Sequence, residues 1–380
     1  IEGAIVTLTN KKGATIRATG FDNENRGAVV EIAGDTTVTN AGIIAARLDD
    51  DDPYVTGSYG VTLKDGTATF SNLEGGVVGG AIAGLQIDTP STDEESTEAN
   101  ITNAGTIEGS AWGMALRLNT VVFEFTNTER AIIRGDTAGM LNSGTIQAFT
   151  NDGTIEGTVL QPPGSITTSL TNKGTIEASS GGEYAGFAIV NEGTITTLTN
   201  EGVIDGAVTL GSATLDIEGT DARITGAVTG TDTVNVKGNF STENTFDVEV
   251  FNIATGGTLT LAHKITTGHN SFHNDGTMIV AVGTQNIVGN FTTTGTFSPS
   301  IVDMDNYGKL VVDGDIALGG TLKANNGVTV QGLSEGTLTD IITYTGSRTG
   351  EFASVLGAND LFEWSAEYDD AGKRVNLVLE

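Results

Sequence analysis

The chain has 380 residues, no cysteine and a formal net charge of −30. This charge excludes nucleic acid and an anionic membrane surface as direct ligands, because both would repel the protein. No stretch reaches the ~18 apolar residues of a membrane-spanning helix, so no membrane insertion by these residues is expected. The 53 glycines and the abundance of β-branched residues favour an all-β fold.

A short phrase of the form Leu-Thr-Asn-x-Gly-Thr-Ile recurs along the chain. Its cleanest copy occupies residues 170–176, and others occupy 101–107, 149–155, 189–195 and 198–204. Asn and Gly enter left-handed backbone conformations at low cost, and the flanking residues are strand formers. Each copy therefore predicts the end of one strand, a tight bend and the start of the next strand.

The spacing of the phrase predicts the architecture. Asn151, Asn172 and Asn191 follow one another at intervals of about 20 residues, and a unit this short cannot bury its apolar face alone. We therefore predict a parallel β-helix, a solenoid whose right-handed coils follow from the general crossover rule. The shorter steps from Asn142 to Asn151 and from Asn191 to Asn200 predict the same bend at two corners of one coil. The Asn side chains are predicted to form hydrogen-bonded ladders along a corner.

Acidic stretches interrupt the repeat region, which we assign to residues 1–306. A loop at 49–58 contains Asp49, Asp50, Asp51 and Asp52, and a loop at 88–100 contains Asp93, Glu94, Glu95 and Glu98. Such carboxylates could bind Ca²⁺, but neither loop has the glycine-punctuated spacing of a calcium loop, so solvated acidic loops are favoured. A third, shorter interruption lies at 161–165.

Residues 307–380 are richer in apolar residues than the repeats before them. Within them, residues 363–368 and 375–379, joined by a turn at 369–372, predict a β-hairpin. The open end of a β-helix is an edge that would recruit other chains. We therefore interpret residues 307–380 as a C-terminal β cap.

Residues 307–380 also resemble the C-terminal part of autotransporter passenger domains, the pertactin-like class of type V secretion. The resemblance rests on Tyr-x-x-Leu-x-Val-x-Gly from Tyr307, Leu-Gly-Gly-Thr-Leu from Leu318 and Gly-x-Phe from Gly350. The repeat phrase is similar to that of the acidic, self-associating adhesins of this class. The resemblance implies an autochaperone role for 307–380 and export through the outer membrane of a Gram-negative bacterium to the cell surface. It also implies an outer-membrane barrel beyond Glu380.

We expect a non-enzymatic passenger that acts in adhesion or bacterial self-association, without a cofactor, through a long face of polar and acidic side chains. No Gly-Asp-Ser-Gly signature of a serine protease is found in the sequence. The alternatives are a binder of a host surface protein or glycan, and the stalk of a toxin or enzyme whose active module lies upstream of Ile1.

Two further sets of residues have competing interpretations. Arg134-Gly135-Asp136 is an integrin-type tripeptide, yet residues 133–136 are in phase with the repeats at 107–110 and 155–158, so the repeat alone explains the glycine. His263, His269 and His273 fall within one coil's length and could hold a metal, but surface placement is favoured.

Overall fold

The computed structural model describes residues 6–18, 27–45, 57–89, 96–268, 271–325, 333–357 and 363–380. These residues form strands, turns and bends, and none of them belongs to a helix that could cross a membrane. The chain divides into two compact units, unit 1 (Ile1–Ala213) and unit 2 (Thr214–Glu380), so the boundary expected at 306/307 lies within unit 2.

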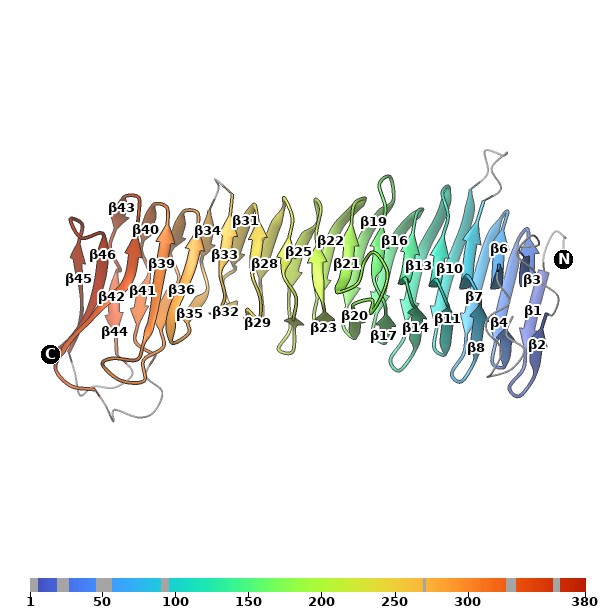
Figure 1. The fold of residues 1–380 in the computed structure, drawn as a ribbon, viewed down its shortest axis with the longest axis horizontal. Coiled ribbons are helices and arrows are strands. Elements are labelled where there is room, and N and C mark those ends of the chain that lie inside the picture. Colours follow the sequence, from blue (N-terminus) through green and yellow to red (C-terminus); the bar gives the residue numbers. More distant parts are fainter. Residues whose placement is uncertain are drawn as a thin grey trace. The chain divides into compact units, whose positions relative to one another are not determined.

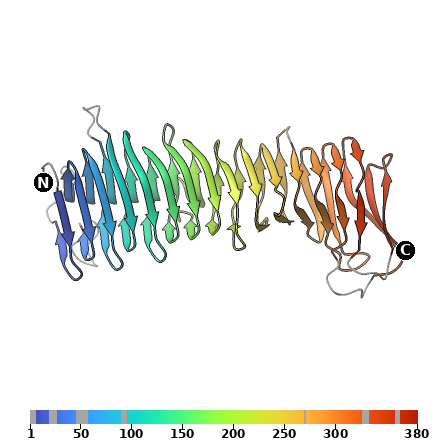
Figure 2. The same cartoon turned by 180° about the vertical axis from the view of Figure 1, so that it is seen from behind.

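Unit 1 is a parallel β-helix in which each coil contributes one strand to each of three sheets (Figure 1). In sheet 1 of this unit, β1 (Val6–Asn10) pairs in parallel with β4 (Thr36–Asn40), and β4 pairs in parallel with β7 (Thr67–Asn72). The same stacks are seen from behind in Figure 2. The β-helix predicted from the repeat spacing is therefore confirmed.

The remaining strands of sheet 1 are β10 (Thr97–Asn103), β13 (Thr120–Asn127), β16 (Thr145–Asn151), β19 (Ile166–Asn172) and β22 (Thr194–Asn200). Sheet 2 of unit 1 consists of β2 (Thr15–Arg17), β5 (Ile43–Ala45), β8 (Val77–Gly80), β11 (Thr106–Gly109), β14 (Ile132–Gly135), β17 (Thr154–Glu156), β20 (Thr175–Glu177) and β23 (Val203–Asp205). Sheet 3 of unit 1 consists of β3 (Gly27–Ala33), β6 (Ser58–Lys64), β9 (Ala83–Asp88), β12 (Trp112–Leu116), β15 (Ala138–Asn142), β18 (Val159–Gln161), β21 (Phe187–Asn191) and β24 (Ala207–Thr209).

The asparagines that end the strands of sheet 1 form a continuous hydrogen-bonded ladder. Asn127 Nδ2 donates to Asn151 Oδ1 at 2.8 Å, and Asn151 Nδ2 donates to Asn172 Oδ1 at 2.8 Å. Asn151 Nδ2 also donates to the backbone oxygen of Thr175 at 3.1 Å, which fixes the bend into sheet 2. These amides are buried, so the ladder satisfies polar groups that water cannot reach. Its members are Asn10, Asn40, Asn72, Asn103, Asn127, Asn151, Asn172 and Asn200. The predicted ladder is confirmed.

A second corner uses the same bend. Asn142 and Asn191 end strands of sheet 3, whereas Asn151 and Asn200 end the sheet 1 strands that follow them. Asn142 Nδ2 donates to Gln161 Oε1 at 2.9 Å, so a glutamine takes the asparagine position in β18. The nine-residue steps in the sequence therefore mark two corners of one coil, as predicted.

Unit 2 consists of parallel coils with a different internal column. At the position that Asn holds in unit 1, the first strands of unit 2 carry Ile217, Val236 and Ile253, which pair in register. Phenylalanines fill the adjacent core, and the rings of Phe251 and Phe272 stack with centroids 5.1 Å apart. In these first coils of unit 2, an apolar column takes the place of the amides.

Three groups of stacked strands form unit 2. The first contains β25 (Thr214–Ile217), β28 (Thr233–Val236), β31 (Val250–Ile253), β34 (Phe272–Asn274), β37 (Phe291–Thr293), β40 (Ile316–Leu318) and β43 (Arg348–Gly350). The second contains β29 (Asn239–Ser241), β32 (Thr258–Leu261), β35 (Thr277–Val280), β38 (Thr296–Pro299), β41 (Thr321–Lys323) and β44 (Ser354–Leu356). The third contains β27 (Val228–Thr229), β30 (Phe246–Val248), β33 (Ile265–Thr267), β36 (Gly283–Val288), β39 (Gly308–Asp313), β42 (Gly336–Tyr344), β46 (Arg374–Leu379) and β45 (Trp364–Asp369), and the short β26 (Arg223–Ile224) precedes β27.

The C-terminal end of unit 2 is closed by an antiparallel hairpin. Strands β45 and β46 pair antiparallel, and β46 pairs antiparallel with β42. The predicted hairpin and cap are confirmed. Within 307–380, strands β39 to β44 still stack in parallel on earlier coils, so the antiparallel closure is confined to the edge formed by β42, β46 and β45.

Candidate functional site

The outer face of sheet 1 in unit 1 carries an unbroken column of hydroxyl groups. In each strand the residue before the ladder asparagine is Thr or Ser, and its side chain is half-buried or exposed. The pairing places these residues directly beside one another from coil to coil, as for Thr126 and Thr150. We call this set the threonine column: Thr9, Thr39, Ser71, Thr102, Thr126, Thr150, Thr171 and Thr199.

The chemistry of the threonine column is uniform and uncharged. A hydroxyl group is both a donor and an acceptor, so a hydroxyl column can pair with another copy of itself. A second column two residues earlier is less regular, because Glu124 and Ala148 interrupt its hydroxyl side chains. The threonine column is therefore the more continuous of the two surfaces.

A groove of about 370 Å³ runs beside the outer face of sheet 2 in unit 1. It is lined by Ala45, Gly79, Gly80, Ala81, Glu108, Gly109, Arg134, Gly135, Asp136, Glu156, Gly157, Glu177, Ala178, Ser179 and Ser180. Glycines make up its floor because the backbones of neighbouring strands approach closely there. A Cβ on Gly135 would meet the backbone nitrogen of Gly113 in the preceding coil at 2.6 Å, and a Cβ on Gly157 would meet the backbone oxygen of Gly135 at 2.5 Å.

Charged side chains line the groove in register. The pairing of β11, β14, β17 and β20 places Glu108, Arg134, Glu156 and Glu177 side by side in successive coils. Arg134 Nε donates to Glu108 Oε2 at 3.0 Å, so the first two of these charges form an ion pair. Burial, and then the neighbouring charges of Glu156 and Asp205, raise the pKa of Glu177 above its ordinary value. The two later carboxylates therefore repel each other across one coil spacing.

The tripeptide Arg134-Gly135-Asp136 lies in this groove. Arg134 and Gly135 end β14, and Gly135 pairs in register with Gly109, as the phase of the repeat predicts. Asp136 is in the turn that follows, where its backbone oxygen accepts a hydrogen bond from Ser179 Oγ at 2.7 Å. The arginine is held by Glu108, so the tripeptide lies along a strand and a turn that are both fixed by neighbouring coils.

Several of the other predicted site residues fall on parts of the chain without a structural description. Asp49, Asp50, Asp51, Asp52, Asp93, Glu94, Glu95 and His269 lie outside the described residues. The base of the loop at 88–100 is described, and Thr97 Oγ1 donates to the backbone oxygen of Asp88 at 2.7 Å. The interruption at 161–165 is a tight turn, in which Ser165 Oγ donates to the backbone oxygen of Pro162 at 2.7 Å.

The two described histidines lie on different strands or turns. His263 follows β32, with Nδ1 2.8 Å from the backbone oxygen of Thr242, and His273 lies in β34. Among the described residues, no group of three or more metal-binding side chains is suited to hold a metal ion.

One excursion was missed by the sequence interpretation. Residues 178–186 leave the coil after β20 and fold back, and Tyr184 and Phe187 pack against the sheet 3 cluster that includes Leu160 and Val190. Thr158 Oγ1 anchors the return of the segment by donating to the backbone oxygen of Phe187 at 2.7 Å. The signal was present in Ser179-Ser180-Gly181-Gly182, which breaks the repeat phrase.

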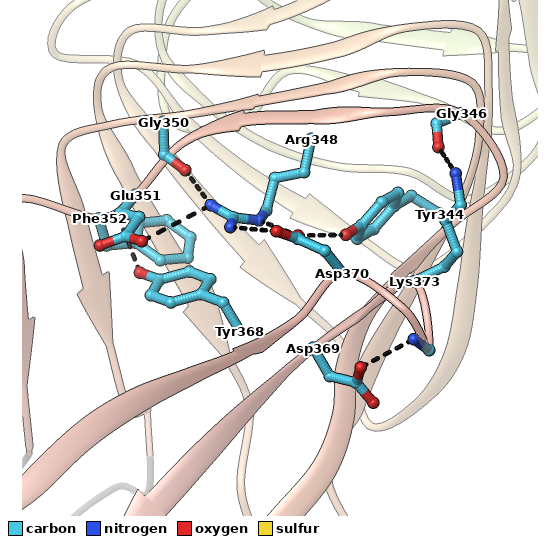
Figure 3. Close-up of polar contacts among 11 residues, drawn as sticks. Tyr344, Gly346, Arg348, Gly350, Glu351, Phe352, Tyr368, Asp369, Asp370 and Lys373 are labelled. Carbon is cyan, nitrogen blue, oxygen red and sulfur yellow. Dashed lines mark hydrogen bonds and ion pairs between the residues drawn. The ribbon is translucent and has the colours of Figure 1, made fainter.

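A second polar cluster lies in the cap of unit 2 (Figure 3). The guanidinium of Arg348 makes two hydrogen bonds to Asp370, Nε to Oδ1 at 2.7 Å and the second to Oδ2 at 2.9 Å. Its Cζ lies 4.6 Å from the centre of the Tyr368 ring. Tyr344 donates to Asp370 Oδ1 at 2.9 Å. The hydrogen bonds from Arg348, and then from Tyr344, lower the pKa of Asp370.

This cap cluster holds the C-terminal hairpin against the last parallel coil of unit 2. Arg348 begins β43 and Asp370 lies in the turn between β45 and β46, so their pairing ties the hairpin to the last parallel coil. The side chain of Arg348 is only 11% exposed, and its donors are taken up by Asp370 and the backbone oxygen of Gly350.

Comparisons with known proteins add no family to this description. No family model matches the chain, and no curated protein matches it significantly.

Proposed function

We propose that this chain is a cell-surface passenger that mediates bacterial self-association, without catalysis and without a cofactor. The observation that supports this proposal best is the threonine column of unit 1, an uncharged and self-complementary stripe on a protein of net charge −30. Two copies of such an acidic protein repel each other, so they need a contact surface that adds no further charge. The threonine column is such a surface.

The proposed mechanism relies on repetition. A single hydroxyl–hydroxyl contact contributes only about 1 kcal/mol or less, because water competes for both partners. Contacts at successive coils are tethered to one another, so each one made raises the effective concentration of the next. A column from Thr9 to Thr199 therefore gives avidity from weak and reversible contacts.

A role in receptor binding through the tripeptide receives less support from the geometry. The guanidinium of Arg134 is engaged by Glu108 and Gly135 is packed against the next coil. A receptor would have to break the ion pair before it could bind the arginine.

The proposal is tested by settling of bacteria that display the chain. Thr126→Glu combined with Thr150→Glu places two carboxylates in the middle of the threonine column, and we expect the cells to stay suspended while cells with the original chain settle. The matched control is Thr106→Glu combined with Thr154→Glu, which adds the same charges at half-buried threonines on the outer face of sheet 2.

The control cells are expected to settle like those with the original chain. Equal loss of settling in both variants would show that added charge alone disperses the cells. Failure of the original chain to cause settling at any salt concentration would refute self-association.

A further inference from the structure

We infer that the outer face of sheet 3 in unit 1 binds an extended, neutral β-1,4-linked glycan, which stacks on Tyr59 and Trp112 and accepts hydrogen bonds from Arg117. This face belongs to a different sheet from the threonine column. The inference therefore goes beyond self-association and does not depend on it.

An apolar column lies on the outer face of sheet 3. In β12, Met114 and Leu116 are buried in the core, so Ala115 between them points outward. The same alternation places one outward apolar residue in each of the next three strands. The four residues pair in register from coil to coil: Ala115, Leu141, Leu160 and Val190. Each of them is at most 8% exposed, so other side chains cover the column.

Four half-buried aromatic side chains pack against the cluster that contains this column. We call this set the aromatic face: Tyr59, Trp112, Tyr184 and Phe187. Tyr59 pairs in register with Ala83, and Ala83 pairs with Trp112. Trp112 in turn pairs with Ala138 in the next coil, so small residues flank its ring on both sides. The rings therefore form a row of flat apolar surfaces along the coils.

Polar groups lie at the end of the aromatic face that carries Tyr59 and Trp112. The column continues in register from Ala115 to Gln86 and then to Thr62. Thr62 is only 4% exposed, and its Oγ1 is buried without a hydrogen-bond partner among the described residues. Most buried hydroxyl groups are hydrogen-bonded, because an unpartnered one costs free energy. Thr62 therefore points to a ligand that carries hydroxyl groups of its own.

Arg117 is the cation at this end of the aromatic face. It donates from Nη2 to the hydroxyl of Tyr59 at 3.4 Å, and its Cζ lies 5.2 Å from the centre of the Trp112 ring. No ion pair joins it to a carboxylate in the described part of the chain, although acidic residues outnumber basic ones by 48 to 18. A guanidinium has five N–H donors, so donors remain for the oxygens of a ligand after the contact with Tyr59.

These features select a neutral glycan as the ligand. One face of a hexose ring with equatorial hydroxyls consists of C–H groups, which pack on the electron-rich face of an aromatic ring. The hydroxyls at the edge of the sugar are acceptors for Arg117 and both donors and acceptors for Gln86. A purely apolar partner would bury Thr62 and Arg117 without hydrogen bonds, and a polyanion would be repelled by the net charge of −30.

The row of rings also predicts the shape of the glycan. Tyr59 and Trp112 lie two coils apart, which is about 9.6 Å at the usual spacing of strands. Phe187 begins β21, which lies three strands beyond β12 in the same sheet, so the row follows the stacking of the coils. An extended β-1,4-linked chain presents the same ring face at every second sugar and can follow this row. An α-1,4-linked chain curves away from it, so we expect cellohexaose to bind more tightly than maltohexaose.

The experiment uses the fluorescence of the two tryptophans of the full 380-residue chain. Trp364→Phe leaves Trp112 as the only tryptophan, and we expect titration with cellohexaose to change its emission until one site per chain is filled. Trp112→Phe leaves Trp364, which belongs to β45 in unit 2, and its emission should stay constant. Maltohexaose should require a concentration about fivefold higher or more for the same change.

Calorimetric titration measures the affinity of variants that lack the indole ring or the cation. Trp112→Ala and Arg117→Ala are each expected to weaken the binding of cellohexaose by about tenfold or more. The matched control is Phe123→Ala, which removes a half-buried ring from β13 in sheet 1. Far-ultraviolet circular dichroism establishes that each variant is folded.

Unchanged affinity in the control, together with both losses, supports the site. The inference would be wrong if cellohexaose left the emission of Trp112 unchanged, or if maltohexaose bound equally well. It would also be wrong if Phe123→Ala weakened binding as much as Trp112→Ala. Unchanged affinity of the Arg117→Ala variant would contradict it as well, because the guanidinium would then donate nothing to the glycan.

Discussion

Asn151 shows why a ladder residue cannot be exchanged singly, although unit 2 carries aliphatic residues at the same position. Its amide accepts a hydrogen bond from Asn127 and donates to Asn172 and to the backbone of Thr175. In unit 2 the corresponding positions of Val236 and Ile253 are apolar together and pair in register, so neither requires a hydrogen bond from the other. Replacing both partners of a buried hydrogen bond by apolar residues changes the stability little. Replacing only one partner leaves the other buried without a hydrogen bond, which destabilises the fold.

We therefore predict that Asn151→Ala lowers the free energy of unfolding of the chain by about 2–4 kcal/mol, because the side-chain oxygen of Asn172 loses its donor inside the corner. Urea unfolding followed by far-ultraviolet circular dichroism measures this change. Thr150→Ala, the neighbouring residue on the outer face, is the control and should cost no more than about 0.5 kcal/mol. Similar losses for the two variants would contradict the role given to the ladder.

The asparagine positions could be predicted from the sequence, but the groove could not. The phrase around Asn151 and Asn172 specifies a bend by local backbone chemistry, and stacking of identical bends follows from the repeat length. The groove depends on how closely separate strands approach at Gly135 and Gly157, which is a property of neighbouring coils. The break in the repeat phrase at 179–182 marks the excursion at 178–186, but its path could not be predicted, since its anchoring contacts to residues 136 and 158 lie in earlier coils.

At the scale of elements, the hairpin of β45 and β46 depends on carboxylates that must stay ionised. Hydrogen bonds from Arg348 and Tyr344 lower the pKa of Asp370, and the backbone amide of Gly372 and then Arg374 lower that of Asp369. A depressed folded-state pKa contributes stability above the unfolded-state pKa, and this stability is lost as the pH falls through the folded value. The window lies below about pH 4, the ordinary range of aspartate.

We predict that the cap unfolds at a lower urea concentration at pH 3 than at pH 7. Trp364 in β45 reports on the cap alone when the other tryptophan is removed by Trp112→Phe. In this background, Asp370→Asn should lower the midpoint at pH 7 and reduce the difference between the two pH values. Asp152→Asn, in a turn of unit 1, serves as the control. A full acid shift in the Asp370→Asn variant would exclude this carboxylate as its source.

In the cap, the strands could be predicted from the sequence, but the side-chain contact that holds them in place could not. The hairpin itself was predicted from its alternating residues and its turn, and it is confirmed with strands 364–369 and 374–379. The ion pair between Arg348 and Asp370 was not predicted. Arg348 and Asp370 are 22 residues apart and neither belongs to a recognisable motif, so only their positions in the folded cap bring them together.

At the scale of the whole molecule, coils are interchangeable units. Every third strand of unit 1 occupies the same sheet, and the register from Asn127 through Asn151 to Asn172 is unbroken. The free energy of unfolding of such an array is approximately the sum of the intrinsic stabilities of its coils and of the interaction energies between neighbouring coils. Removing one complete coil should therefore leave the rest able to stack.

We predict that deletion of residues 152–172 yields a folded protein, because β20 would then stack on β14, β21 on β15 and β22 on β16 in the original register. Deletion of residues 152–161 removes β17 and β18 but leaves β19, so the order of the sheets is broken. Circular dichroism and resistance to protease measure folding of both proteins. Equal folding of the two deletions would contradict the coil as the unit of stability.

The ladder has a further consequence for the order in which the chain can fold. Partners along it are separated by as few as 21 residues, between Asn151 and Asn172, and by no more than 32, between Asn40 and Asn72. No coil of unit 1 waits for a distant segment to close its corner, so loop-closure entropy stays small at each step. A chain that becomes available gradually from either end can complete its coils one after another, with only the newest still unfolded. The directional row of amides then acts as a template, in which each finished corner presents the hydrogen-bonding groups that position the next.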